Sequence, residues 1–229
     1  MNRWGVPVCI ATGLLCVRAG AQKWDVECDV ATYGAEKRDA PNRNIDAGAC
    51  LAPLESRPAP GGISARTLKH KPSKAARTEF DHGVQSWLKG RSKEAAEHFT
   101  EAIRLDPDSV EARIDLGIIY VKSGHPEKAL DQDEQGLALE PNLAILHTNK
   151  AAALAMLNRW AEAEMAARRA VQLDPSSTAA QYMVGLAMLM QDKVTPEVAE
   201  HLASASKAYS KAKVLLIEVQ EELRRNGPH

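Results

Sequence analysis

The sequence predicts an all-α fold, an α-solenoid of about four helical hairpins that ends in a capping helix. The first observation is a spacing of 34 residues between three triplets, Leu105-Asp106-Pro107, Leu139-Glu140-Pro141 and Leu173-Asp174-Pro175. The second is a tiny residue at the eighth place of each period, namely Gly83, Gly117, Ala151 and Gly185. Such a period is typical of stacked repeats, and tiny residues let two helices cross at close range. The pattern favours a binding surface over a catalytic centre.

Alignment on the prolines divides the predicted array, residues 73–226, into units. The units are repeats 76–109, 110–143 and 144–177, a degenerate fourth over 178–209, and a capping helix over 211–225. The two helices of each unit are separated by a residue that tolerates left-handed backbone: Gly90, Gly124, Asn158 and Asp192. We therefore expect helices at 73–89, 93–105, 110–123, 126–139, 144–157, 160–173, 178–191, 196–207 and 211–225.

Start signals support several of these helices. Ser73, Ser92 and Thr195 are predicted N-caps, and Pro126 and Pro196 stand where the first helical residue is expected. The last helix is predicted to have one apolar side and a charged back. The apolar residues are Val214, Leu215, Ile217, Val219 and Leu223. This pattern favours a cap for the open end of a solenoid over a partner-docking helix, and its mixed charges argue against a membrane surface.

The repeats resemble those of the tetratricopeptide repeat (TPR) family, whose pattern is W-x2-L-G-x2-Y, A-x3-F and P. The second repeat shows Leu116-Gly117-Ile118-Ile119-Tyr120, Ala129 and Pro141, and the resemblance covers about 150 of the 229 residues. It implies a right-handed superhelix, and the signal peptide described below predicts an exported bacterial type of TPR protein. The tryptophan place holds Glu79, Arg113, His147 and Gln181. Asp133 takes the place of a packed aromatic, so we expect it near a helix interface and expect the second repeat to be the loosest.

The resemblance also implies that the first helix of each unit lines a concave groove. The predicted partner-groove residues are Phe80, Val84, Trp87, Ile114, Asp115, Ile118, Val121, Thr148, Asn149, Tyr182, Met183 and Leu186. This mostly apolar wall suits an apolar or amphipathic peptide or helix. Two alternatives stay open. The groove is filled by the chain's own leader, or these side chains are ordinary packing.

One known TPR ligand is disfavoured. The family's carboxylate clamp for chaperone tails needs lysine, asparagine and arginine at five places. Those places hold Phe80, Val84, Asp115, Ile145 and Asn149.

The sequence also lacks the common catalytic and phosphate-binding motifs, so we predict no enzyme and no catalytic, cofactor or metal site. His82 and His98 lie in paired helices, but no third ligand is apparent in the sequence.

The first 72 residues differ from the array. Residues 1–21 have a short basic start, an apolar stretch and Ala19-Gly20-Ala21, which predicts a Sec signal peptide cleaved after Ala21. A lipoprotein is less favoured, because bulky Leu15 precedes Cys16. Residues 22–72 form an irregular leader or linker. In an oxidising compartment its Cys28 and Cys50 favour a disulfide over two free thiols.

These features predict a periplasmic or secreted, non-catalytic scaffold of the bacterial cell envelope that binds another protein or peptide in its groove. The alternative is a structural or assembly component that self-associates, with the groove occupied by its own leader. A formal net charge of -1 gives no signal for nucleic acid. No stretch is long enough for a stable membrane span. The sequence does not specify the oligomeric state.

Overall fold

The computed structural model describes residues 70–226. The predicted signal peptide over 1–21, its cleavage at Ala21, nearly all of the leader over 22–72, and the candidate disulfide of Cys28 and Cys50 lie outside the described residues.

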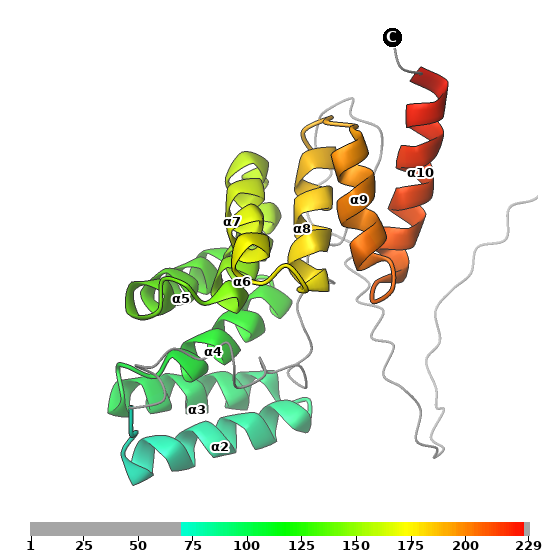
Figure 1. The fold of residues 1–229 in the computed structure, drawn as a ribbon. Helices are drawn as coiled ribbons and strands as arrows, with labels where there is room; N and C mark the ends of the chain where they lie inside the picture. The colour runs from blue at the N-terminus through cyan, green and yellow to red at the C-terminus, as the bar shows by residue number, and fades with distance from the viewer. Residues whose placement is uncertain (1–69, 227–229) are drawn as a thin grey trace, which may run out of the picture.

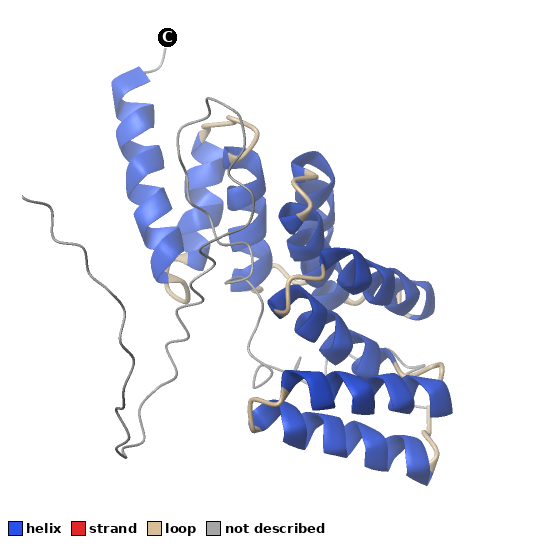
Figure 2. Cartoon of the chain, turned by 180° about the vertical axis from the view of Figure 1, so that it is seen from behind, coloured by secondary structure: helices blue, strands red, loops and turns tan. Residues whose placement is uncertain are grey.

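Nine α-helices and no strand make up the described part of the chain (Figure 2). The helices are α2 (Lys74–Leu88), α3 (Ser92–Leu105), α4 (Val110–Lys122), α5 (Pro126–Leu139), α6 (Ala144–Met156), α7 (Trp160–Leu173), α8 (Thr178–Leu189), α9 (Pro196–Ala205) and α10 (Ser210–Asn226). Each helix end lies within two residues of the sequence prediction. None of these helices is long and apolar enough to cross a membrane.

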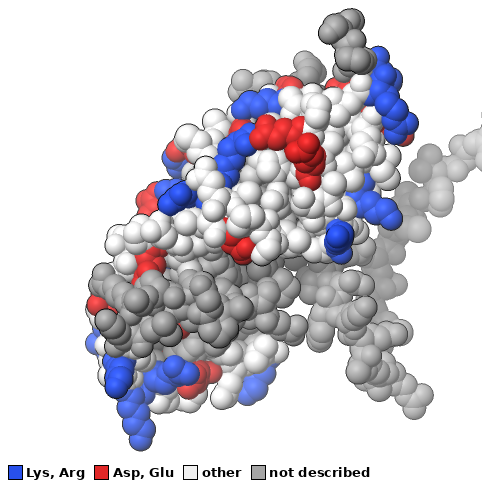
Figure 3. All heavy atoms as spheres, viewed as in Figure 1, with Lys and Arg blue, Asp and Glu red and all other residues white. Residues whose placement is uncertain are grey.

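The helices stack as hairpins along one curved array (Figure 1). In each hairpin the two helices pack together, and each second helix also packs on the first helix of the next hairpin. In addition, α4 contacts α6 and α6 contacts α8, so the first helices of the last three hairpins lie side by side. On the face shown in Figure 3, positive and negative side chains are interspersed rather than gathered by sign.

The turn inside each hairpin begins with the same geometry in all four units, although the turn of the fourth unit is longer and continues to Thr195. Gly90, Gly124, Asn158 and Asp192 have φ angles of 74°, 75°, 57° and 57°. The following N–H reaches back five residues to a helix carbonyl, as in Arg91 to Ser86 at 2.9 Å and His125 to Tyr120 at 2.8 Å. These bonds satisfy carbonyls that the helix end would otherwise leave open. The predicted left-handed turns are therefore confirmed.

The predicted helix starts are only partly correct. Ser73 caps α2, because its Oγ accepts from the Ala76 N–H at 3.1 Å. The expected Ser92 cap is wrong. Arg91 ends the turn and occupies the N-cap position, so Ser92 is already the first residue of α3. Thr195 occupies the N-cap of α9, but its hydroxyl makes no cap bond and is buried without a hydrogen-bond partner.

Tiny residues allow the helices of a hairpin to meet closely. A Cβ added at Gly83 would lie 2.7 Å from the Phe99 ring, and one at Gly185 would lie 2.9 Å from Leu202. Such distances leave no room for a larger residue. The position of the tiny residue within each repeat therefore determines where the paired helices cross.

Asp133 lies in the helix interface, as expected. Its side chain faces Gly117, where a Cβ would lie 3.1 Å from Oδ1, and the residue has no exposed surface. Neither of its carboxylate oxygens has a hydrogen-bond partner. Burial raises the pKa of this carboxyl well above its usual value, an effect that Lys150 opposes and Glu134 reinforces. The looseness of the second repeat stays a prediction.

The apolar residues of α10 lie on two faces, which corrects the expectation of a single side. Leu215 and Val219 are buried, whereas Val214 and Ile217 are 55% and 48% exposed. Residues four apart share a helix face, and at 100° per residue Val214 and Ile217 point away from the Leu215–Val219 face. The helix therefore packs with one stripe and leaves a second apolar pair outside.

We predict that Asp133→Ala stabilises the protein at neutral pH. Because the folded-state pKa is raised, the folded state is penalised as pH rises above the unfolded pKa of about 3.9. Removing the carboxyl should therefore raise the free energy of unfolding by about 2 kcal/mol at pH 7, and this gain should shrink as pH falls toward 4. Ala167 already occupies the same place in the third repeat and is fully buried.

Urea unfolding at several pH values measures this difference. Asp131→Ala, which removes an exposed carboxylate from the same helix, is the matched control and should give no gain. A stability gain from Asp133→Ala that is equal at pH 4 and pH 7 would contradict a raised pKa for this buried carboxyl.

Candidate functional site

The candidate site is the face formed by the first helices of the hairpins, α2, α4, α6 and α8. All twelve predicted groove residues lie on these helices. Ten of them are buried: Phe80, Ile114, Asp115, Ile118, Val121, Thr148, Asn149, Tyr182, Met183 and Leu186. Val84 and Trp87 on α2 are partly exposed. The role of these residues in partner binding stays a prediction.

Most of the predicted apolar residues meet in one cluster. Ile114, Ile118 and Val121 of α4 belong to the same buried group as Tyr182, Met183 and Leu186 of α8. Phe80 belongs to a second group, in which its ring lies 5.5 Å from that of Phe99. Trp87 packs against both groups, so it joins the first repeat to the rest of the face.

The polar residues of this face are held differently from one another. Thr148 donates to the Ala144 carbonyl of its own helix at 3.1 Å. Asn149 is only 2% exposed, and its Nδ2 has no hydrogen-bond acceptor. A buried donor without a partner costs about 1–3 kcal/mol. Asn149 is therefore a polar group inside the packed helices whose missing bond costs stability, and it is not accessible to a ligand.

The open edge of the face lies where α2 approaches α4. Leu88, at the end of α2, is 68% exposed. Beside it, the Lys122 ammonium lies 5.0 Å from the centre of the Trp87 ring. A cation over an indole face is a favourable contact that also holds the positive charge in place. This edge combines accessible apolar surface with a positioned positive charge.

A second periodic contact positions the helices, and the sequence analysis did not predict it. In repeats two to four, the residue at the family's tryptophan place hydrogen-bonds through its side chain. The acceptor is the carbonyl of the proline that closes the preceding repeat. The distances are 2.9 Å for Arg113 to Pro107, 2.9 Å for His147 to Pro141 and 3.1 Å for Gln181 to Pro175. The sequence signal for this contact was that each of these three residues follows a closing proline by six positions. These bonds tie α4, α6 and α8 to the turn before each of them.

Burial lowers the pKa of His147, although its bond to Pro141 opposes the shift. The imidazole is therefore neutral at pH 7, and because a carbonyl only accepts, Nε2 carries the proton in this bond. The tie between α6 and the preceding turn consequently persists at neutral pH.

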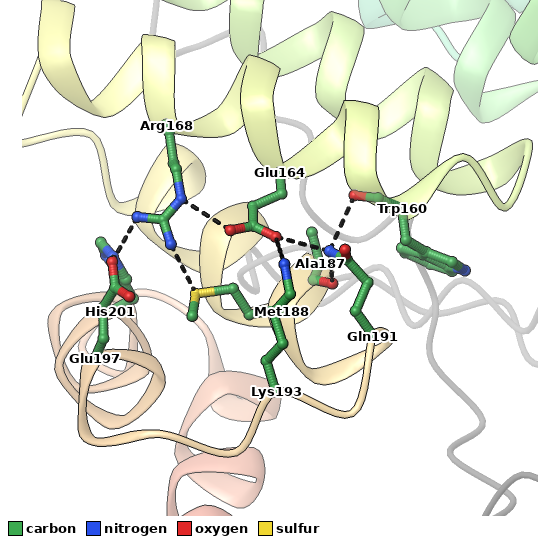
Figure 4. Close-up of polar contacts among 9 residues, drawn as sticks. All are labelled: Trp160, Glu164, Arg168, Ala187, Met188, Gln191, Lys193, Glu197 and His201. Atoms are coloured by element: carbon green, nitrogen blue, oxygen red, sulfur yellow. Dashed lines mark hydrogen bonds and ion pairs between the residues drawn. The ribbon is translucent and has the colours of Figure 1, made fainter.

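A polar network holds the degenerate fourth unit to the third (Figure 4). Glu164 of α7 accepts from Lys193 at 2.8 Å, from Gln191 at 2.7 Å and from Arg168 at 2.9 Å. Arg168 also bonds Glu197 at the start of α9, and its third contact is the Met188 sulfur at 3.3 Å. The network therefore spans α7, α8, the following loop and α9.

Charge in this network is balanced. Burial raises the pKa of Glu164, but the bonds from Lys193, Arg168 and Gln191 together outweigh it, so the net pKa is lowered. The hydrogen bond to Glu197 is the largest cause that raises the pKa of Arg168. Both groups stay charged at neutral pH. They keep α8, which carries Tyr182, Met183 and Leu186, fixed against the third repeat.

The structure corrects one expectation about metal ligands. The sequence analysis found no third ligand near His82 and His98, but Glu79 lies beside both. Glu79 and His82 are three residues apart and share a face of α2, and the hairpin brings His98 of α3 to them. Sequence reasoning missed Glu79 because the contact requires the crossing of α2 and α3.

The sequence model of the tetratricopeptide repeat family matches residues 87–153. A peroxisomal targeting signal receptor from Candida albicans is 31% identical over 117 residues, 49% of this chain. The match spans only 20% of that receptor.

Two solved structures share the fold. One, from a functional characterization of Pseudomonas aeruginosa pilF, matches 66% of this chain and 70% of that chain, with a TM-score of 0.59 at 19% identity. The other, the first TPR of Spaghetti (RPAP3) bound to an HSP90 peptide, matches 54% of this chain and 98% of that chain, with a TM-score of 0.52 at 18% identity. Residues 87–153 therefore carry tetratricopeptide repeats, and the helices described here form an all-α array with the tetratricopeptide repeat fold.

Proposed function

We propose that this chain is a non-catalytic scaffold that binds a peptide or helix segment of a partner protein on the face of α2, α4, α6 and α8. The observation that carries the proposal is the accessible apolar surface of Leu88 next to Trp87, with the Lys122 ammonium held 5.0 Å from the centre of the indole ring. A peptide or helix segment offers both groups that this surface suits, namely apolar side chains and a carboxylate.

The open edge indicates the chemistry of the partner segment. Leu88 and Trp87 offer apolar contacts, and Lys122 favours a nearby acidic side chain or terminal carboxylate. The proposed ligand is therefore an amphipathic segment with apolar anchors and at least one carboxylate. It differs from the acidic chaperone tails, because the five clamp places hold other residue types.

The comparisons support this class of function. One relative is named as a targeting signal receptor, and the RPAP3 repeat was solved with an HSP90 peptide. These partners belong to those proteins. What this chain shares with the RPAP3 repeat is the helical array of the tetratricopeptide repeat fold.

The first test maps the partner segment to the face. A photo-crosslinking amino acid placed at Leu88 should capture a defined segment of a partner, identified by mass spectrometry. The matched control is the same amino acid at Met165, which is 66% exposed on α7, a second helix. A synthetic peptide of the captured segment is then titrated against the chain by fluorescence anisotropy.

We predict that Leu88→Glu and Lys122→Glu each weaken binding of that peptide about tenfold or more, because the first removes an apolar contact and the second reverses the charge that faces the carboxylate. Met165→Glu should leave the affinity unchanged. Leu186 is unsuitable as a probe because it has no exposed surface and its loss would disturb the core. Crosslinks from position 165 alone, or equal affinity in all three variants, would refute binding at this face.

We further propose that the scaffold acts in the bacterial cell envelope, as a periplasmic or secreted protein. The support is the sequence of residues 1–21, with its apolar stretch and the Ala19-Gly20-Ala21 site. Intact-mass analysis of the chain recovered from an envelope fraction should give a protein that begins at Gln22. A chain recovered only from the cytosol with residues 1–21 intact would count against this assignment.

A second candidate function, self-association in an assembly, is favoured by one observation. Val214 and Ile217 form an apolar pair exposed on the last helix of the array. We predict that the chain forms dimers at micromolar concentration and that Val214→Glu together with Ile217→Glu shifts it to monomer in sedimentation equilibrium. A parent chain that is monomeric at every concentration would eliminate this candidate.

A further inference from the structure

Three side chains at the start of the array form a compact group of metal-ligating type. Glu79 and His82 come from α2, and His98 comes from α3. One ligand atom from each residue lies within 4.8 Å of the other two. The His98 Nδ1 is already 2.8 Å from a Glu79 carboxylate oxygen, and the two imidazole rings lie edge to face at 5.4 Å. We propose that this group is a binding site for a divalent transition metal ion, with Zn²⁺ as the reference ion.

The donor set suits zinc. Two imidazole nitrogens and one carboxylate oxygen are a known open zinc ligand set, in which water completes the coordination. Zinc–ligand bonds of about 2.0–2.2 Å place neighbouring ligand atoms of a tetrahedral site roughly 3.3 Å apart. The present spacing needs only small side-chain rotations to close. His82 is exposed and the other two are part-buried, so an ion can enter from solvent without moving the helices.

The backbone that carries these ligands is held firmly. His82 precedes Gly83, and His98 precedes Phe99. A Cβ at Gly83 would lie 2.7 Å from the Phe99 ring. The ligands therefore flank the closest crossing of α2 and α3, where the main chains have little freedom to separate. A site on two such helices keeps its ligand spacing without the ion, which reduces the entropic cost of binding.

Other histidines in the described part of the chain lack this arrangement. His70 pairs with Asp106, His147 with the Pro141 carbonyl, and His201 with Gln181 and Glu197. Among residues 70–226, the group of Glu79, His82 and His98 is the one that meets the geometric requirement for three ligands. Within that range no repeat precedes α2, which packs on α3. A bound ion would tie the outermost described helix to its partner and oppose fraying of this end.

The test is isothermal titration of Zn²⁺ into the chain without a polyhistidine tag. We expect one ion per chain, and at least a tenfold loss of affinity in His82→Ala and in Glu79→Gln. Both variants should fold, because His82 is exposed and the glutamine amide still offers His98 a hydrogen-bond partner. His125→Ala, which removes an exposed histidine outside the group, is the matched control and should bind as the parent does.

A second measurement reports on α2 itself. Zn²⁺ should slow amide hydrogen exchange in residues 74–88 of the parent chain and not in His82→Ala. Parent-like zinc affinity in His82→Ala would overturn the proposal. An equal loss in His125→Ala would do the same, because binding would then be nonspecific. The zinc titration uses no peptide, so the metal site and the proposed peptide binding can each fail without the other.

Discussion

The close crossing of paired helices at the eighth place of each repeat is the constraint on which the rest of the molecule depends. Gly83 lies against Phe99, and Gly185 lies against Leu202. A Cβ at either glycine would displace the facing side chain, because atoms of Phe99 and Leu202 already occupy that space. The crossings recur at one spacing along the chain. Repeated stacking then places α4, α6 and α8 side by side, and Trp87 of α2 joins the first repeat to them.

This constraint explains which features could be predicted from the sequence. Helix ends follow from local chemistry, such as a left-handed residue at Gly90 or Asn158, so they were predictable to within two residues. The bonds from Arg113, His147 and Gln181 to the preceding prolines were not predicted, because they depend on how one hairpin meets the next. The same is true of Glu79 beside His98. Side-chain exposure on the candidate face was also beyond prediction, because it depends on how tightly successive first helices pack.

The fourth unit shows how the array continues where the period fails. Its second helix starts after a longer, irregular turn, and Thr195 makes no cap bond there. Ion pairs replace the missing regularity: Arg168 reaches Glu197 on α9, and Lys193 reaches Glu164 on α7. Because Glu164 is largely buried, its several bonds must offset the cost of removing its charge from water. These ion pairs and hydrogen bonds thereby help to position the fourth unit, a role that repeated apolar contacts have elsewhere in the array.

Helix α2 connects the two proposals made for this protein. At 100° per residue, Glu79 and His82 lie on one side of α2, while Val84, Trp87 and Leu88 lie on another. The metal group thus contacts α3, and the opposite residues form the open edge of the peptide face. An ion that holds α2 in place would lower the entropic cost of ordering Trp87 and Leu88 when a peptide binds. The two sites would then bind with positive coupling, and by linkage the peptide would raise zinc affinity by the same factor. Such coupling requires only that the outermost described hairpin frays less; the rest of the array stays unchanged.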